Sequence, residues 1–139
     1  MIRIGKKPVD ILLVKQKGSI PTPRTSSSLN FYETLNILIL FGGKNEKLEK
    51  VYNDLYIFDL DLYVWVRVNL FDQIPVERAE HNAVVYKDKL IIFGGINTNN
   101  YMGSDFNFVN LSKNSLILDI WENKKKLWNI RFERRKKEG

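Results

Sequence analysis

The sequence predicts an all-β protein assembled from two copies of one structural unit. The motif at residues 20–24 (IPTPR) returns at residues 74–78 (IPVER), 54 positions further along the chain. In each copy an apolar run ends in a Gly-Gly doublet, at residues 42–43 and at residues 94–95. A fixed period of about this size is typical of repeat architectures. The apolar runs are short and lie between polar turn residues, which indicates strands.

Each copy is expected to contain four strands. In the first copy, two runs joined by a tight polar turn are followed by two further runs, which predicts strands over residues 26–32, 35–41, 54–60 and 64–70. The same reading of the second copy predicts strands over residues 80–86, 90–93, 116–122 and 127–132. The runs 37–41 and 90–93 are continuously apolar, which favours strands that are covered on both faces.

The two Gly-Gly doublets have a backbone explanation. Glycine accepts positive φ and allows another segment to approach closely, so a doublet after a buried strand indicates a sharp exit in crowded surroundings. A phosphate-binding loop is the alternative. Neither doublet extends to GxGxxG or GxxxxGK[ST], and no helical pattern follows either one. We therefore do not expect nucleotide binding.

Together these motifs resemble the kelch repeat, which forms one four-stranded blade of a β-propeller. The resemblance rests on Pro-x-x-Arg, the Gly-Gly doublet, an aromatic–acid pair and a Trp six residues later. The first copy matches with Pro21, Arg24, Gly42, Gly43, Phe58, Asp59 and Trp65. The second matches with Pro75, Arg78, His81, Gly94, Gly95, Trp121, Glu122 and Trp128. The aromatic residue of the pair is usually Tyr, and the second copy has Glu where Asp is usual.

The resemblance implies a partial β-propeller of two four-stranded antiparallel kelch blades plus one extra N-terminal strand. Blade one covers residues 20–70 and blade two residues 74–132. Because residues 11–14 align with residues 65–68, residues 9–15 are expected to form the outer strand of a preceding blade. The partial propeller thus spans residues 1–132, and a basic tail follows at 133–139.

The segment after the second doublet is longer than its counterpart. Gly43 lies 16 positions before Asp59, whereas Gly95 lies 27 positions before Glu122. This predicts a long surface loop with a small extra strand over residues 106–109.

Two blades are too few for a closed propeller, which typically has four to eight. Each open end leaves an apolar sheet face uncovered, at a cost on the order of 10 kcal/mol. We therefore expect further kelch blades, from the same or another chain, to cover these faces.

Composition and charge narrow the function classes. No apolar run approaches 18 residues and no secretory leader is apparent, so we expect a cytoplasmic protein without a membrane partner. The net charge of +6 lies entirely in residues 124–139, which hold eight basic and two acidic residues. This tail could meet nucleic acid or an acidic partner, but no aromatic stacking platform accompanies it. A solvated terminal segment is the favoured interpretation.

The sequence lacks residue types that several common catalytic centres require. The chain has one histidine and no cysteine, which excludes three-His zinc sites, thiolate nucleophiles and Cys-ligated metals. We expect no cofactor, no metal and no enzymatic activity of the chain itself. His81 lies where kelch repeats often have histidine, and is expected to be structural. Asp59 is expected to stabilise a turn.

The resemblance implies protein binding by the loops at an end face of the propeller. By position, the candidate partner-binding residues are Arg24, Asn45, Glu46, Arg78, Asn97, Asn99, Asn100 and Tyr101. For Arg24 and Arg78, a structural role between blades is the alternative, because both copies carry the arginine at the same place. The motif residues expected to support the fold are Gly42, Gly43, Asp59, Trp65, His81, Gly94, Gly95, Glu122 and Trp128.

Two functions are consistent with these expectations. The first is a non-catalytic scaffold or adaptor that binds a partner protein. The second is a fragment of a larger kelch-containing enzyme, for example a kelch-linked protein phosphatase, whose catalytic domain lies outside these residues.

Overall fold

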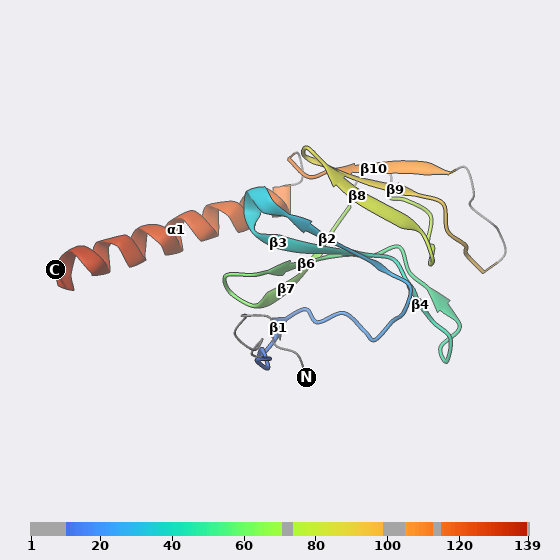
Figure 1. Ribbon diagram of the computed structural model, residues 1–139, viewed down its shortest axis with the longest axis horizontal. Coiled ribbons are helices and arrows are strands. Elements are labelled where there is room, and N and C mark those ends of the chain that lie inside the picture. Colours follow the sequence, from blue (N-terminus) through green and yellow to red (C-terminus); the bar gives the residue numbers. More distant parts are fainter. Residues whose placement is uncertain (1–10, 71–73, 99–104, 113–114, 139) are drawn as a thin grey trace, which may run out of the picture.

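Two mainly antiparallel β-sheets lie face to face and form the body of the protein (Figure 1). The structure is a computed structural model that describes residues 11–70, 74–98, 105–112 and 115–138. The first sheet has the order β1-β7-β6-β3-β2, from β1 (Lys17–Gly18), β2 (Ser28–Tyr32), β3 (Ile37–Phe41), β6 (Leu55–Asp59) and β7 (Val64–Val68). The second has the order β10-β9-β8, from β8 (Asn82–Tyr86), β9 (Lys89–Phe93) and β10 (Phe106–Asn110). A small hairpin joins β4 (Lys44–Asn45) and β5 (Lys50–Val51).

The all-β prediction is confirmed, and the first copy has the four strands expected of it. β2, β3, β6 and β7 each lie inside a predicted range and pair antiparallel with their neighbours. A 3-10 turn, η1 (Glu33–Leu35), connects the first two. Asn36 ends it in the left-handed region with φ 51°, a conformation that asparagine tolerates better than most residues. The four strands therefore form one blade-like sheet.

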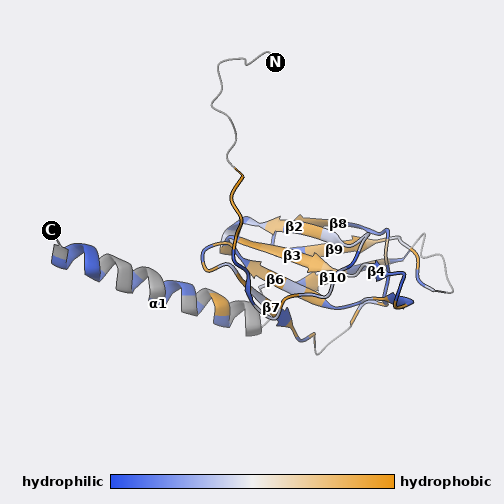
Figure 2. Cartoon of the chain, turned by 90° about the horizontal axis from the view of Figure 1, so that it is seen from below, coloured by the Kyte–Doolittle hydropathy of each residue, from blue (hydrophilic) through white to orange (hydrophobic). Residues whose placement is uncertain are grey.

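The core lies between the two sheets. From the first sheet, Ile37, Ile39 and Phe41 of β3 point into it and are fully buried. Leu90 and Ile92 of β9 meet them from the second sheet. Figure 2 shows hydrophobic residues concentrated in the strands of both layers, with hydrophilic residues in the connections and the helix. Alternating apolar positions thus fix which face of each sheet is buried.

Two polar bonds join the sheets at the edge of the core. Asn30 Nδ2 donates to the Ala83 carbonyl at 3.1 Å, and the Tyr32 hydroxyl donates to Asp88 Oδ1 at 2.5 Å. Burial and the Asp88 carboxylate raise the pKa of Tyr32 above its usual value. These bonds fix the register of the two sheets relative to each other.

The second copy differs from the prediction after its second strand. β8 and β9 are confirmed, but residues 116–122 and 127–132 are not strands, because both lie in the helix α1 (Ser115–Glu138). The third strand is β10, which pairs along its whole length with β9. It was expected only as an extra strand inside a loop. The second sheet therefore has three strands among the described residues.

The predicted insertion is wrong for the same reason. Asp54 precedes β6 by one residue and follows Gly43 by 11 positions, and Asp105 precedes β10 and follows Gly95 by 10. The spacing of the repeat is thus preserved as far as the third strand. The pair Trp121-Glu122, which was taken to mark that strand, belongs to α1.

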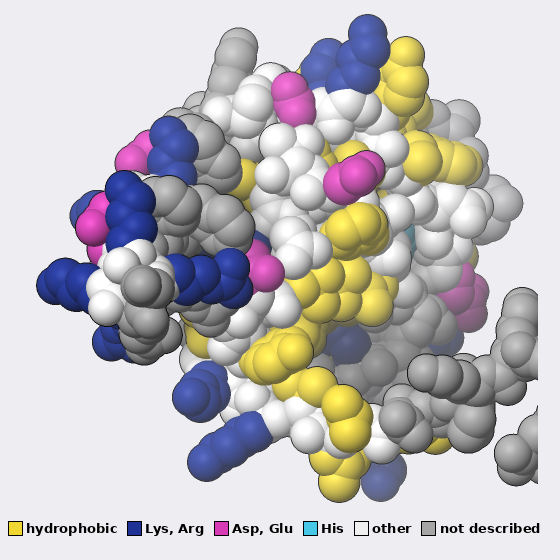
Figure 3. All heavy atoms as spheres, turned by 60° about the vertical axis from the view of Figure 1, so that its left-hand side comes forward, with side chains coloured by type: hydrophobic (Ala, Val, Ile, Leu, Met, Phe, Trp, Pro, Cys, Tyr) yellow, Lys and Arg dark blue, Asp and Glu magenta, His cyan; other side chains and the backbone are white. Residues whose placement is uncertain are grey.

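The composition of α1 accounts for its helical state. Residues 115–138 contain no Gly or Pro and are rich in Lys, Arg and Glu, which are strong helix formers. Lys124 Nζ binds the Leu35 carbonyl, the Asn36 carbonyl at 3.2 Å and Asp59 Oδ1 at 3.2 Å. This lysine anchors the helix to the turn end of the first sheet. Residues 133–138 of the predicted tail continue the helix, and Figure 3 shows basic side chains gathered along it.

The strand predicted over residues 9–15 is absent from its described part. Residues 11–16 have no regular secondary structure, while residues 9 and 10 lie outside the described residues. β1 follows instead and runs parallel to β7, with Lys17 N donating to the Tyr63 carbonyl at 3.1 Å. Gly18 has φ 85°, and a Cβ there would lie 2.3 Å from the Trp65 carbonyl oxygen. The prediction assigns this strand to a preceding blade, and the described residues include no strand of such a blade to pair with it.

The two sheets expose opposite faces of the repeat. Side chains equivalent to the buried ones of β6 and β3 are exposed in the second sheet, namely Phe93, Phe106 and Phe108. The outer face of the first sheet exposes Leu29 and Phe31. None of the described helices is long and apolar enough to span a membrane. Uncovered apolar faces at both ends are what the incomplete propeller predicts.

We expect Ile39→Ala to lower the free energy of unfolding by about 2–5 kcal/mol, because Ile39 is fully buried between the sheets. Leu29→Ala is the matched control, since Leu29 is 56% exposed on the outer face of the adjacent strand. Its cost should stay below about 1 kcal/mol. Urea denaturation of both variants measures the difference. Equal losses would contradict the assignment of inner and outer faces.

Candidate partner-binding face

The connections at one end of the sheets form a continuous surface, which we call the loop face. It consists of residues 22–25, 44–51, 76–80 and 95–98 and lies on the right in Figure 1. Isolated bridges between Thr25 and Lys44 and between Ala79 and Ile96 hold the connections against the sheet exits. The opposite end carries the tight turns and α1. The loop face is therefore the more open of the two ends.

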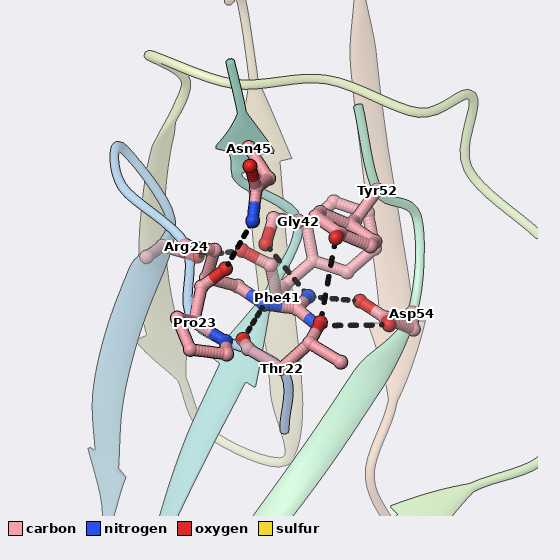
Figure 4. A network of polar contacts seen from close by, with 9 residues as sticks. Thr22, Pro23, Arg24, Phe41, Gly42, Asn45, Tyr52 and Asp54 are labelled. Atoms are coloured by element: carbon pink, nitrogen blue, oxygen red, sulfur yellow. Dashed lines mark hydrogen bonds and ion pairs between the residues drawn. The ribbon is translucent and has the colours of Figure 1, made fainter. Parts of the chain in front are cut away.

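Arg24 is held inside the loop face by a complete set of acceptors (Figure 4). Its guanidinium pairs with both carboxylate oxygens of Asp54, and its Nη1 also donates to the Gly42 carbonyl at 3.2 Å. Nε donates to the Thr22 carbonyl at 3.1 Å, and Nη2 to the Thr22 hydroxyl at 3.2 Å. The guanidinium carbon lies 3.9 Å from the Tyr52 ring centroid. All five N–H groups of Arg24 are thus engaged.

Arg78 repeats this arrangement in the second copy. Nε donates to the Val76 carbonyl at 3.0 Å, Nη1 to the Gly94 carbonyl at 3.3 Å, and Nη2 to Asp105. Its side chain is 0% exposed and that of Arg24 4%. The hydrogen bond from Arg78 lowers the pKa of Asp105, as does the positive charge of the guanidinium. This geometry favours the structural alternative for both arginines.

Reasoning from sequence missed the acidic partners of these arginines. Asp54 and Asp105 carry the ion pairs, and Tyr52 stacks on Arg24. The signal was available, because each acid lies 10 or 11 positions after its Gly-Gly doublet. It was passed over because the aromatic–acid pair further along was used to place the third strand.

His81 lies in the contact between the two copies. Its Nε2 is 2.9 Å from the Ser28 hydroxyl, and its ring packs edge-on against Phe41 with centroids 5.4 Å apart. Burial, together with the positive charge of the nearby Arg78, lowers the pKa of His81 to about 4. The ring is therefore neutral near pH 7 and is placed to pack.

The Gly-Gly doublets lie at the exits of β3 and β9, where the linker between the copies passes close to both sheets. Gly42 has φ 66°, and a Cβ there would be 2.7 Å from the Arg78 carbonyl oxygen. Gly95 has φ 98° and a Cβ there would be 2.7 Å from the Ala79 carbonyl oxygen. Any larger residue at either place would push the linker away from the sheet.

The candidate loop residues divide into three groups. Asn45 is half-buried and braces the hairpin, since its Nδ2 donates to the Pro23 carbonyl at 3.1 Å and its Oδ1 accepts from Leu48 N at 3.2 Å. Glu46 is exposed beside Lys44, whose pKa is raised mainly by a hydrogen bond to Glu80. Asn97 is half-buried on the same face. Asn99, Asn100 and Tyr101 lie outside the described residues.

The remaining motif residues are placed as follows. Asp59 Oδ1 accepts from Asp61 N at 2.8 Å and Leu62 N at 3.1 Å, which is the expected turn. Trp65 packs on Phe58 with ring centroids 4.9 Å apart. Glu122 and Trp128, expected in strands, are both in α1. The described residues contain no group of three or more His, Cys, Asp and Glu side chains that could hold a metal ion.

Comparison with known proteins gives one family and several partial relatives. The model of the KLHDC2/KLHL20/DRC7 Kelch-repeats domain matches residues 9–127. Dynein regulatory complex subunit 7 of Chlamydomonas reinhardtii is 30% identical over 79 residues, which cover 57% of the chain and 7% of that protein. A probable serine/threonine-protein kinase of Dictyostelium discoideum is 39% identical over 85 residues, or 60% of the chain and 6% of that protein. Acyl-CoA-binding domain-containing protein 5 of Arabidopsis thaliana is 33% identical over 84 residues, which cover 60% of the chain and 12% of that protein. The matched region is thus a small part of each relative.

Arg24→Ala should lower the free energy of unfolding by about 3 kcal/mol, because it leaves the Asp54 carboxylate buried without its partner. Arg67→Ala is the control, since Arg67 is exposed on β7 and should change stability by no more than about 0.5 kcal/mol. Chemical denaturation measures both. A loss no larger than that of the control would remove Arg24 from the structural role.

His81 should make stability depend on pH. Its pKa is about 4 in the folded chain and near 6.5 in the unfolded chain, so the unfolded state binds the extra proton between these values. The free energy of unfolding should therefore fall as the pH drops, by about 2 kcal/mol between pH 7.5 and about 5. His81→Gln should flatten this slope in urea denaturation across that range. An unchanged slope would place its origin in other groups.

Proposed function

We propose that this chain, which belongs to the KLHDC2/KLHL20/DRC7 Kelch-repeats family, is a non-catalytic scaffold or adaptor that binds a partner protein through its loop face. Kelch repeats form protein-interaction modules, and this supports the general class. The finer assignment rests on one observation, the division of the loop face into a rigid base and a variable rim.

The base of the loop face consists of internally bonded residues that both copies share. Arg24 with Asp54, and Arg78 with Asp105, use their polar atoms within the chain. Such residues position a surface and offer little to a partner. We therefore assign Arg24 and Arg78 a positioning role in this proposal.

The rim differs between the copies. In the first copy, the β4–β5 hairpin raises Glu46 and Leu48 into solvent, and their side chains are well exposed. The second copy has an Asn-rich segment at the corresponding place, beginning at Asn97. Rigid sheets that carry loops of differing sequence are the usual arrangement of a recognition surface. An exposed apolar residue flanked by charges can act as an anchor for a partner.

We also propose that these residues perform no catalysis of their own. His81 is buried, bonded to Ser28 and neutral at pH 7. The carboxylates of Asp54 and Asp105 are paired with arginines. These engagements occupy the groups that acid–base chemistry would require.

Replacing two exposed rim residues should weaken partner capture. We expect Glu46→Lys combined with Leu48→Asp to reduce recovery of specific partners at least about tenfold, because both side chains project from the hairpin. Leu62→Asp is the matched control, since Leu62 is exposed in the turn at the opposite end. Quantitative mass spectrometry of pull-downs from the source cells compares the three chains. Equal recovery with both variants would contradict binding through the loop face.

The alternative is a segment of a larger kelch-containing enzyme. It is compatible with the comparisons, because the matched residues span only 6–12% of the three relatives described and one of them is named as a probable kinase. In that case the same loop face would bind a substrate or regulator for a catalytic domain elsewhere. Sequencing the full transcript distinguishes the two, since a continuous reading frame into a catalytic domain supports the alternative.

A further inference from the structure

The second sheet has an unpaired edge where the first sheet has a strand. In the first sheet, β6 pairs with β3 on one side and with β7 on the other. β10 holds the equivalent place in the second sheet, and it pairs with β9 only among the described residues. The chain then turns into α1, which leads away from the sheet toward the other end of the molecule (Figure 1). The outer edge of β10 thus presents backbone donors and acceptors to another strand.

A spare strand sequence lies elsewhere in the chain. By the repeat spacing, residues 11–14 (ILLV) are equivalent to residues 65–68 of β7, the strand for which the second sheet has no counterpart among the described residues. Ile11, Leu12 and Leu13 are almost fully exposed, and Val14 is 43% exposed. Four consecutive apolar residues in solvent are an unfavourable arrangement for an isolated chain.

The two exposed apolar faces form the same kind of pair as the two faces that are buried against each other. Val84, Phe93 and Phe108 are exposed on the outer face of the second sheet. The equivalent face of the first sheet is the one that is buried between the two sheets. Leu29 and Phe31 are exposed on the outer face of the first sheet. The equivalent face of the second sheet is the one that is buried between the two sheets. A second copy placed in the same relation as the second sheet to the first would cover one face of each kind.

We propose that residues 11–14 of one copy add as the fourth strand to the edge of β10 in a second copy, with the outer face of the first sheet covering the second sheet beneath them. The pairing of β6 with β7 sets the register: Leu55 faces Val68 and Ile57 faces Val66. By equivalence Val14 faces Phe106 and Leu12 faces Phe108. Leu12 and Val14 then lie on the exposed apolar face of the second sheet.

The contact uses different surfaces on the two copies. Each copy offers a strand and a face at one end and receives them at the other, so the association is head-to-tail. Such a contact continues until it closes into a ring. Closed propellers of four, six or eight blades would need two, three or four copies. The loop face remains open in this arrangement, so the contact is separate from the proposed partner binding.

Cysteine cross-linking tests the register directly, because the chain contains no cysteine of its own. A Leu12→Cys chain is mixed with a larger, tagged Phe108→Cys chain and oxidised. Directly opposite residues in an antiparallel pair have Cα atoms about 4.5–5.5 Å apart, which lies within the range that a disulfide spans. We expect a mixed disulfide dimer of both chains on a denaturing gel.

The control is a Val84→Cys chain in place of the Phe108→Cys chain. Val84 lies in the same row of the same exposed face, since both Val84 and Phe108 are opposite Ile91, but on the far edge strand. It is therefore roughly 10 Å further from the added strand. We expect at least about fivefold less cross-linking. Equal cross-linking of the two pairs, or none with either, would overturn the proposal.

The mass in solution provides a second readout on the intact chain. Light scattering should give a multiple of 16.3 kDa that depends on concentration. Leu12→Asp should weaken association at least about tenfold while leaving the circular dichroism of the monomer unchanged, because Leu12 is exposed in the single chain. Leu48→Asp, on the loop face, should retain the wild-type mass. A monomeric wild-type chain, or an unchanged mass for Leu12→Asp, would overturn strand donation.

Discussion

The burial of one apolar sheet face against the next is the constraint on which the structure depends. Each sheet has apolar side chains on both faces, and one pair of faces is buried, between β3 and β9. Apolar burial is the largest favourable contribution to folding. The position of the second sheet therefore determines which apolar face of each sheet is buried. The remaining contacts either fix the spacing between the two sheets or lie on the surface that the sheets leave exposed.

The spacing is fixed by the linker between the copies. Arg78 contributes its carbonyl to Gly43 N at 2.9 Å and its side chain to Asp105, so one residue joins the exit of the first sheet to the third strand of the second. His81 fills the remaining space against Phe41. Because these groups are polar and buried, their bonds define one arrangement of the sheets among the many that apolar contact alone would allow. The variable loops project from this fixed base.

The first copy was predictable from sequence and the end of the second was not, for identifiable reasons. Short apolar runs and the turn signals between them placed β2, β3, β6 and β7 correctly, because local preference and burial agree there. Trp121-Glu122 imitated the motif of the first copy, although the surrounding lysines and glutamates prefer a helix. Arg24 and Arg78 lie on the loop face, where the repeat pattern predicts them, but their side chains are buried. Their ion pairs with Asp54 and Asp105 depend on long-range strand order, and for Asp105 the misplaced third strand of the second copy concealed it.

The two arginine clamps differ in one respect that bears on how the protein responds to its surroundings. The Asp54 side chain is 10% exposed, whereas that of Asp105 is 39% exposed. Dissolved ions screen an exposed pair far more than a shielded one. Rising ionic strength should therefore loosen the second clamp first, and fraying would begin at the three-stranded sheet. A partner that shields Asp105 from water would strengthen its ion pair with Arg78. Binding at the loop face would then stabilise the linker between the two sheets.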